Sequence, residues 1–258
     1  MVLFTKIDRP PPNAPQSAIW HFGWHVTDVR KSLAIYTDCA DVKLLPLYTT
    51  DEGSSVLVSS DTWPNVGGVL GLTREQIAEA RAKGVQPPGG GGFAYMTGPD
   101  DALVEYAGNY PTERFNHVHL WQEEPLRALL WYQRHLNAPS RAGFPAPPSE
   151  AECDVPRGAD RTWPARNREG MFRTPRAGVE FGDVVLTWYA NQGEAPLASP
   201  RGQLQDHIAL SVADLDAWVA KLHSEGVAFL EEPYRIGSTR AAMIEGPSRE
   251  AIELVEAR

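Results

Sequence analysis

Cysteine is scarce in this chain of 258 residues, which contains only two. Two cysteines cannot form a disulfide scaffold, and neither Cys39 nor Cys153 lies in a CxxC pair that would indicate a zinc clip. No GxSxG motif is present, so the sequence gives no support for nucleophilic catalysis. The low cysteine content predicts a protein of a reducing, cytoplasmic compartment.

Basic clusters and long apolar runs are also missing. The 24 Lys and Arg are outnumbered by 33 Asp and Glu, and the net charge of −9 argues against nucleic acid as a partner. No apolar run approaches the roughly 20 residues of a membrane span, and the N-terminus lacks the basic and apolar regions of a signal peptide. We therefore expect neither a nucleic-acid nor a membrane partner, but a small-molecule substrate.

Three breaks rich in proline or glycine divide the sequence, at 10–15, 87–92 and 139–175. The last is longer than the roughly 15 residues usual for a loop in a compact domain, so it could cover a site. Between the breaks, one local pattern occurs three times, which is the signature of an internal repeat.

The clearest copy of the pattern is 206–256. Its first segment, DHIALSVAD, alternates apolar and polar residues like a half-buried strand, with His207 on the polar side. DLDAWVAKLHSEG follows, with an Asp near its start, apolar residues at helical spacing and Gly226 at its end. Three strand-like runs close the unit: VAFLEEPY, TRAAMIEG and EAIELVE. The unit is predicted to be βαβββ.

The other two copies are interrupted. The second starts with FNHVHLWQEE and the helix PLRALLWYQRHL, and resumes as GVEFGDVVLTWYAN after the insertion 139–176. The first comprises IWHFGWHVTD, VRKSLAIYTDC and VKLLPLY, and ends with GFAYMTG and ALVEYAG. An insertion at 51–91 separates these parts and includes a predicted helix, TREQIAEARAKG.

Aligning the copies brings potential metal ligands into register. One histidine stands at the same point of each opening strand, seven residues before an acidic residue: His21, His117 and His207. Near the close of the copies, GPDDALVEY and GPSREAIEL superimpose and place Glu105 opposite Glu253, whereas DVVLTWY places Thr187 there.

HIALSVAD, a helix and IEGPSREAIELVE together resemble the closing module of the vicinal oxygen chelate superfamily. This superfamily includes glyoxalase I, extradiol dioxygenases and bleomycin-binding proteins. The resemblance implies an α+β fold in which repeated βαβββ modules form cupped mixed sheets. It also suggests an N-terminal extension at 1–18, a first module at 19–110 and a C-terminal domain of two modules at 115–258.

In that family, paired modules supply metal ligands from their first and last strands. For the second and third modules, the resemblance implies the ligands His117, His207 and Glu253, because threonine at 187 is a poor ligand. Two His and one Glu with open positions favour Fe(II), although Mn, Co, Ni or Zn could occupy the site. His119 and Tyr189 share the cup-facing side of their strands and are candidate catalytic residues.

A rival pairing of the first and second modules would instead use His21, Glu105 and His117, and His25 lies on the same face as His21. With three modules, one lacks an intramolecular partner and could pair with its counterpart in a homodimer.

The expected function is bidentate chelation of a small oxygenated substrate by an extradiol-dioxygenase-like enzyme. The alternatives are a glyoxalase-type isomerase or lyase, and a metal-free protein that binds an antibiotic-type ligand. Several aromatic residues hint at a flat substrate: Trp121, Trp131, Tyr132 and Tyr189.

Overall fold

The computed structural model describes most of the chain outside the two insertions. The described residues are 8, 17–39, 43–44, 82–83, 93–97, 102–107, 110–142, 149–155, 175–191 and 195–257. The predicted helix at 73–84 lies outside these ranges except for residues 82–83.

The elements follow the threefold pattern expected from the sequence. In the first module they are β1 (Ile19–His25), α1 (Val29–Cys39), β2 (Lys43–Leu44), β3 (Phe93–Thr97) and β4 (Leu103–Ala107). In the second they are β5 (Arg114–Gln122), α3 (Pro125–Leu136), η2 (Glu150–Cys153), β6 (Arg176–Phe181) and β7 (Val184–Ala190). In the third they are β8 (Ile208–Val212), α4 (Leu215–Ser224), β9 (Phe229–Ile236), β10 (Thr239–Glu245) and β11 (Ala251–Glu256).

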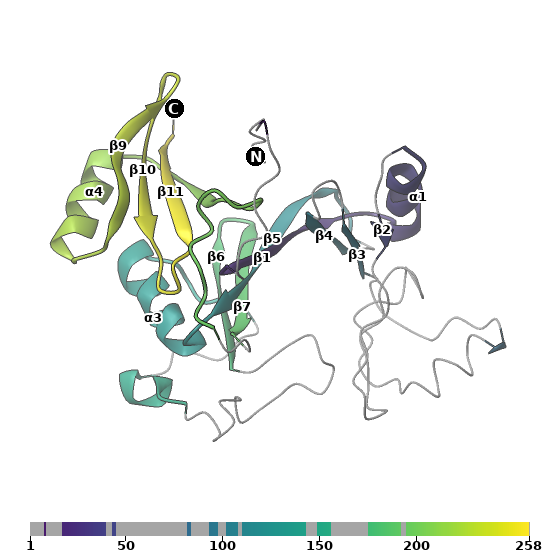
Figure 1. Ribbon diagram of the computed structural model, residues 1–258, viewed down its shortest axis with the longest axis horizontal. Coiled ribbons are helices and arrows are strands. Elements are labelled where there is room, and N and C mark those ends of the chain that lie inside the picture. Colours follow the sequence, from purple (N-terminus) through teal and green to yellow (C-terminus); the bar gives the residue numbers. More distant parts are fainter. Residues whose placement is uncertain are drawn as a thin grey trace.

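These strands form two mixed sheets, so the α+β fold class is confirmed. The seven-stranded sheet has the order β2-β3-β4-β1-β5-β7-β6, and the four-stranded sheet has the order β8-β11-β10-β9. In the larger sheet β1 runs parallel to β4 and antiparallel to β5, so the opening strands of the first two modules lie side by side. The third module keeps its own sheet at the opposite end of the molecule from α1 and β2 (Figure 1).

The third module has the predicted βαβββ order. Its helix α4 begins where the Asp214 side chain accepts a hydrogen bond from the Ala217 backbone N–H at 2.9 Å, which caps an otherwise unsatisfied donor. Leu215 and Leu222 are fully buried and fix the helix against the sheet. The chain leaves the helix through Gly226 at φ +74°, a conformation that glycine adopts without a Cβ clash.

The second module has one regular strand fewer among its described residues. Residues 139–141 run along the outer edge of β6 instead, where Arg141 N donates to Gly178 O at 2.9 Å and Glu180 N donates to Pro139 O at 3.0 Å. The proline-rich insertion therefore starts as a short continuation of the seven-stranded sheet.

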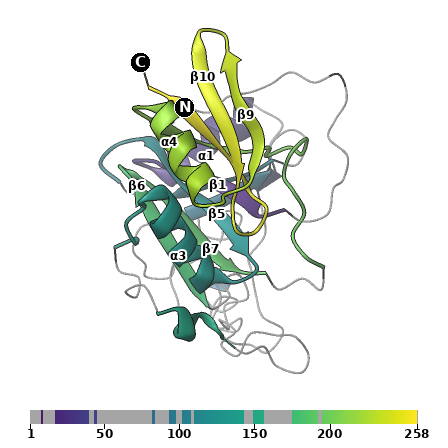
Figure 2. The ribbon, with the colours of Figure 1, turned by 90° about the vertical axis from the view of Figure 1, so that its left-hand side faces the viewer.

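One apolar core joins the second and third modules. It includes Leu120 and Trp188 of the larger sheet, Tyr132 of α3, and Leu215 and Ile252 of the third module. Figures 1 and 2 show α3 and α4 on the same side of the molecule, each next to its own sheet.

A buried carboxylate adds a polar link across this core. Glu250 Oε1 accepts hydrogen bonds from Gln122 Nε2 and from the Tyr132 hydroxyl, both at 2.8 Å. The Glu123 backbone N–H also donates to Ser248 Oγ at 2.9 Å. In the described part of the chain, no helix is both long and apolar enough to cross a membrane.

Candidate metal centre

A cluster of three histidines and one glutamate lies on the face of the seven-stranded sheet away from α3. The apolar side chains of β5, Val118 and Leu120, pack in the core, so the alternating His117 and His119 must point to the opposite face. The β1–β5 ladder places His21 opposite His119 and Gly23 opposite His117. β4 adds Glu105, which is paired with Gly23.

The four side chains are buried and close to one another. Each offers a ligand atom, and these atoms lie within 4.8 Å of one another. The Glu105 carboxylate Oε2 is 3.0 Å from His21 Nε2 and 3.3 Å from His117 Nε2. Adjacent ligands at right angles on one ion, with bonds of about 2.1 Å, stand about 3.0 Å apart. This His/Glu cluster could therefore hold a metal ion.

A neighbouring amide fixes the tautomer of one histidine. Asn116 Oδ1 lies 3.0 Å from His117 Nδ1, and an amide oxygen only accepts, so His117 donates through Nδ1. In the neutral ring, Nε2 then presents a lone pair towards Glu105 Oε2. Two acceptors at this distance need a cation between them, either a proton or a metal ion, and the Asn116 contact is the kind that orients a metal-bound imidazole.

Burial and mutual charge set the protonation states of the cluster. Burial lowers the pKa of His21 and holds that of His119 well below its ordinary value, with the neighbouring histidines adding to the effect at His119. Burial alone would raise the pKa of Glu105. The charge of His117 and the hydrogen bonds from His117 and His21 outweigh burial and hold the Glu105 pKa well below the usual range. The cluster thus combines a carboxylate with two imidazoles, those of His21 and His119, whose neutral form burial favours, and neutral imidazole and carboxylate are donors that bind a divalent cation.

The expected catalytic pair lies directly beside these ligands. The His119 ring stacks on His21 at 4.6 Å and on Tyr189 at 5.3 Å. His119 Nδ1 is buried without a hydrogen-bond partner, which leaves a polar atom of the site for a ligand to satisfy. Burial and Glu105 raise the pKa of Tyr189, so its phenol stays protonated.

Two tryptophans form an aromatic wall next to His119. Trp20 stacks on Trp121 at 4.7 Å, and its ring centroid lies 6.0 Å from that of His119. The β1–β5 ladder is irregular between Ile19 and His21, which lets Trp20 depart from the core-facing side. Trp131 and Tyr132, by contrast, pack with the core on α3.

The guanidinium group of Arg141, at the start of the proline-rich insertion, reaches the site. Arg141 Nη1 donates to Thr187 Oγ1 at 2.5 Å. Thr187 is buried, and it stands where the alignment of modules requires a fourth ligand. The sequence had pointed to Thr187 but not to Arg141, because no periodicity marks the insertion.

The structure does not gather the three ligands first expected. His117 lies in the cluster, whereas His207 and Glu253 belong to the four-stranded sheet, with His207 Nε2 and Glu253 Oε2 3.4 Å apart. The physical reason is that β5 pairs with β1 and not with β8. Among the described residues, the potential ligands that lie together are instead the rival set from the first and second modules, His21, Glu105 and His117. His119 is a fourth member of the group.

Sequence reasoning missed Gly23, which gives His117 its place. A Cβ at this position would lie 2.9 Å from His117 Cδ2 and closer still to Nε2 and Cε1. A glycine inside a strand often marks a close approach of another group, and IWHFGWH contained that signal. His25, the other candidate on β1, stacks on Tyr110 at 3.5 Å and lies outside the cluster.

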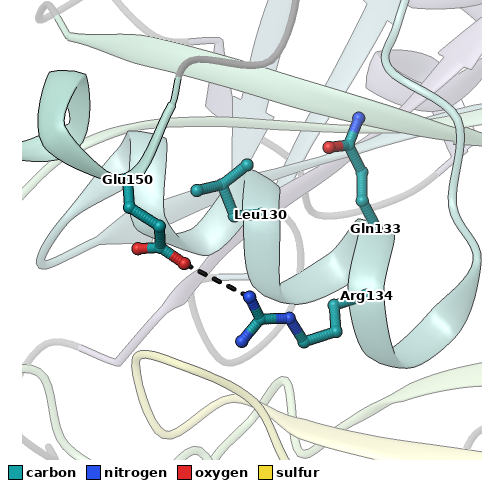
Figure 3. A pocket seen from close by; sticks show the side chains of 4 residues that line it. All are labelled: Leu130, Gln133, Arg134 and Glu150. Carbon is teal, nitrogen blue, oxygen red and sulfur yellow. Dashed lines mark hydrogen bonds and ion pairs between the residues drawn. The ribbon is translucent and has the colours of Figure 1, made fainter.

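A surface pocket lies elsewhere, between α3 and η2. Its lining is Leu130, Gln133, Arg134 and Glu150, with the last two joined by an ion pair of 3.3 Å (Figure 3). The pocket contains no member of the His/Glu cluster, and exposed ion pairs of this kind contribute little binding energy.

Paired modules of this topology around a His/Glu cluster define a protein of the vicinal oxygen chelate type. The family model of the Glyoxalase/Bleomycin resistance protein/Dioxygenase superfamily matches residues 114–254, and the chain belongs to this superfamily.

Solved structures with a similar fold include TioX from Micromonospora sp. ML1, 13% identical over 55% of this chain and 96% of that chain, with a TM-score of 0.37. A virulence protein from Salmonella typhimurium is 13% identical, and the match covers 58% of this chain and 100% of that chain, with a TM-score of 0.37. A lactoylglutathione lyase from Agrobacterium tumefaciens is 12% identical, and the match covers 57% of this chain and 96% of that chain, with a TM-score of 0.36. No curated protein sequence matches the chain.

Proposed function

We propose that His21, Glu105 and His117 hold one divalent metal ion, with Fe(II) favoured, and that the protein is a metal-dependent enzyme. The observation that carries this proposal is the Glu105 oxygen within 3.3 Å of both imidazole nitrogens, at the spacing of adjacent ligands. Two His and one carboxylate with open positions is the donor set of non-haem iron oxygenases. A metal-free binding protein would have no need of this buried set.

The chemistry proposed is extradiol-dioxygenase-like and acts on a small oxygenated aromatic substrate. A metal ion at this position would bind two adjacent substrate oxygens and act as a Lewis acid. His119 carries a buried Nδ1 without a hydrogen-bond partner beside these residues, so this nitrogen is placed to receive a proton from a substrate hydroxyl, and burial keeps the ring neutral beforehand. Tyr189 holds the His119 ring by stacking, and Trp20 and Trp121 offer a flat apolar surface next to it.

A second candidate is a glyoxalase-type isomerase or lyase. It is favoured by the same unpartnered Nδ1 of His119, because isomerisation beside a carbonyl needs a group that moves a proton and no oxygen-binding position. The two candidates share the metal ligands and differ in whether O2 is consumed.

The test is anaerobic reconstitution with Fe(II), metal analysis, and then O2 uptake with a panel of catechols. His21→Ala should lose the metal, whereas His223→Ala, at an exposed position of α4, should retain it. Bound iron with O2 uptake supports the dioxygenase. Bound iron without uptake favours the isomerase or lyase, and failure to bind any divalent metal refutes the proposed site.

A further inference from the structure

A row of paired residues crosses the face of the seven-stranded sheet that carries the His/Glu cluster, and it ends beside Arg141. His21 is paired with His119 across β1 and β5, and His119 is paired with Thr187 across β5 and β7. Thr187 is in turn paired with Gly178 of β6. Residues directly opposite each other on neighbouring strands share one face of the sheet, so the row leads from the cluster to the outer edge.

The start of the proline-rich insertion directs the Arg141 side chain onto this face. Ser140 forms an antiparallel bridge with Val179, which lies in the core, and Ser140 Oγ accepts a hydrogen bond from Gln133 of α3 at 2.7 Å. Ser140 therefore faces α3, and the next residue, Arg141, faces the other side of the sheet. The Arg141 backbone N–H donates to Gly178 O at 2.9 Å, which fixes this register.

A glycine lets the guanidinium group cross β6. A Cβ at Gly178 would lie 3.4 Å from Thr187 Oγ1. Because Gly178 has no side chain, Arg141 reaches over the strand and donates from Nη1 to Thr187 Oγ1 at 2.5 Å. The next backbone N–H, that of Ala142, donates to Glu180 Oε1 at 2.7 Å, which also holds this segment against β6.

The contact brings a positive charge to a place where the other modules have a negative one. Glu105 of the first module and Glu253 of the third stand where the second module has Thr187. A divalent ion in the His/Glu cluster and the guanidinium group of Arg141 would together outweigh the negative charge of Glu105. An anionic group on the substrate would complement this excess of positive charge.

We propose that Arg141 binds a carboxylate group of the substrate, and that the substrate is an aromatic acid with two adjacent oxygens at the end away from the carboxylate. This inference rests on the metal-dependent function proposed above. A guanidinium group presents its N–H donors in a planar fork that matches a carboxylate, whereas a neutral amide lacks the complementary charge. The buried Thr187 hydroxyl orients the fork.

The spacing of the strands fits a substrate with one aromatic ring. Thr187 lies on β7, which is separated from β1 by β5. Neighbouring strands are about 4.8 Å apart, so the contact of Arg141 with Thr187 stands about 10 Å from the strand of His21. A ring that chelates the metal ion through two oxygens and extends its carboxylate towards β7 covers this distance. His119 lies between the two ends, where its unpartnered Nδ1 can receive the hydroxyl proton.

The experiment measures ligand binding by isothermal titration calorimetry on the full chain loaded with Zn2+, which does not oxidise the ligand. The probes are 3,4-dihydroxybenzoate and its neutral counterpart, 3,4-dihydroxybenzamide. The wild type should bind the acid about 10–100-fold more tightly, as expected for hydrogen bonds between charged groups. Arg141→Gln should remove this preference and leave the zinc content and the affinity for the amide unchanged. Arg134→Gln, the same change at an exposed arginine of α3, should retain the preference.

The outcomes separate this inference from the function on which it rests. A zinc-loaded wild type that binds both probes equally would overturn the carboxylate subsite. Arg141→Gln protein that still prefers the acid, or that binds both probes more weakly to the same extent, would do so as well. If the wild type holds no zinc, the metal-dependent function fails, and titration of benzoate against benzamide then tests Arg141 alone: equal binding of the two rules the subsite out.

Discussion

Replacing Gly23 with alanine should remove His117 from the metal site without touching any ligand. The added Cβ would lie 2.9 Å from His117 Cδ2 and nearer to two other ring atoms. Carbon atoms in contact stand about 3.5–4.0 Å apart, so the ring must retreat by more than about 0.6 Å. Metal–ligand distances tolerate about 0.2 Å, and the displacement therefore breaks coordination.

The expected loss of metal affinity exceeds the roughly 10–100-fold that follows changes to groups behind a ligand. The free energy of unfolding should fall by about 1–3 kcal/mol, as for other overpacked sites. Affinity is measured by competition with a chromophoric chelator, and stability by urea denaturation. Gly226→Ala is the control for metal affinity: with no atom within 4 Å of the added methyl group it should bind metal like the wild type, although its left-handed backbone at φ +74° makes it lose stability too.

A double-mutant cycle tests the cause. In a His117→Ala background the ring is gone, so Gly23→Ala should have almost no further effect on metal affinity. If Gly23→Ala alone binds metal like the wild type, the ring does not pack on Gly23 in the working site, and the reasoning fails. If the two losses add, the methyl group acts through something other than His117.

Three further predictions follow from individual contacts. Asn116→Ala should weaken metal binding by about 10–100-fold in the same chelator assay, because His117 loses the acceptor that orients it; wild-type affinity would contradict this. In metal-free protein, burial lowers the pKa of His21 and His119, so below about pH 6.5 the unfolded chain binds protons that the folded chain does not. Urea titrations should show stability lost as pH falls, by up to about 1.4 kcal/mol per pH unit for each histidine, and a flat profile would be evidence against buried neutral rings. Asp214→Ala should lower the free energy of unfolding by about 1 kcal/mol, because it removes the N-terminal cap of α4, and it should leave the metal affinity of the His/Glu cluster unchanged.

Local signals in the sequence were sufficient to predict strands and helices such as β8 and α4. They also showed which potential metal ligands occupy equivalent positions in the three modules. The alternation in DHIALSVAD and the spacing in DLDAWVAKLHSEG predicted β8 and α4, because each depends on residues a few positions apart. The alignment of the three modules placed His21 level with His117 and Glu105 level with Glu253, and the parallel ladders show the first and third modules in matching register.

The choice of partner for each module was not predictable in the same way. Three opening strands carry a histidine at the same point, so the pattern of ligands is the same whichever two strands pair. The outcome depends on hydrogen bonds between β1 and β5, which are separated by about 90 residues, and on the core that holds α3. The contact of Arg141 with Thr187 was not predictable for a related reason, because Arg141 lies in an insertion whose sequence has no periodicity.

A strand has two hydrogen-bonding edges, and this limits how three modules can share ligands. β5 uses one edge for β7 and the other for β1, so β8 has no place beside it in the same molecule. His117 therefore joins His21 and Glu105, and it cannot also join His207 and Glu253. In the described part of the chain, the edge of β8 away from β11 is therefore left unpaired, and His207 and Glu253 stand apart from the His/Glu cluster.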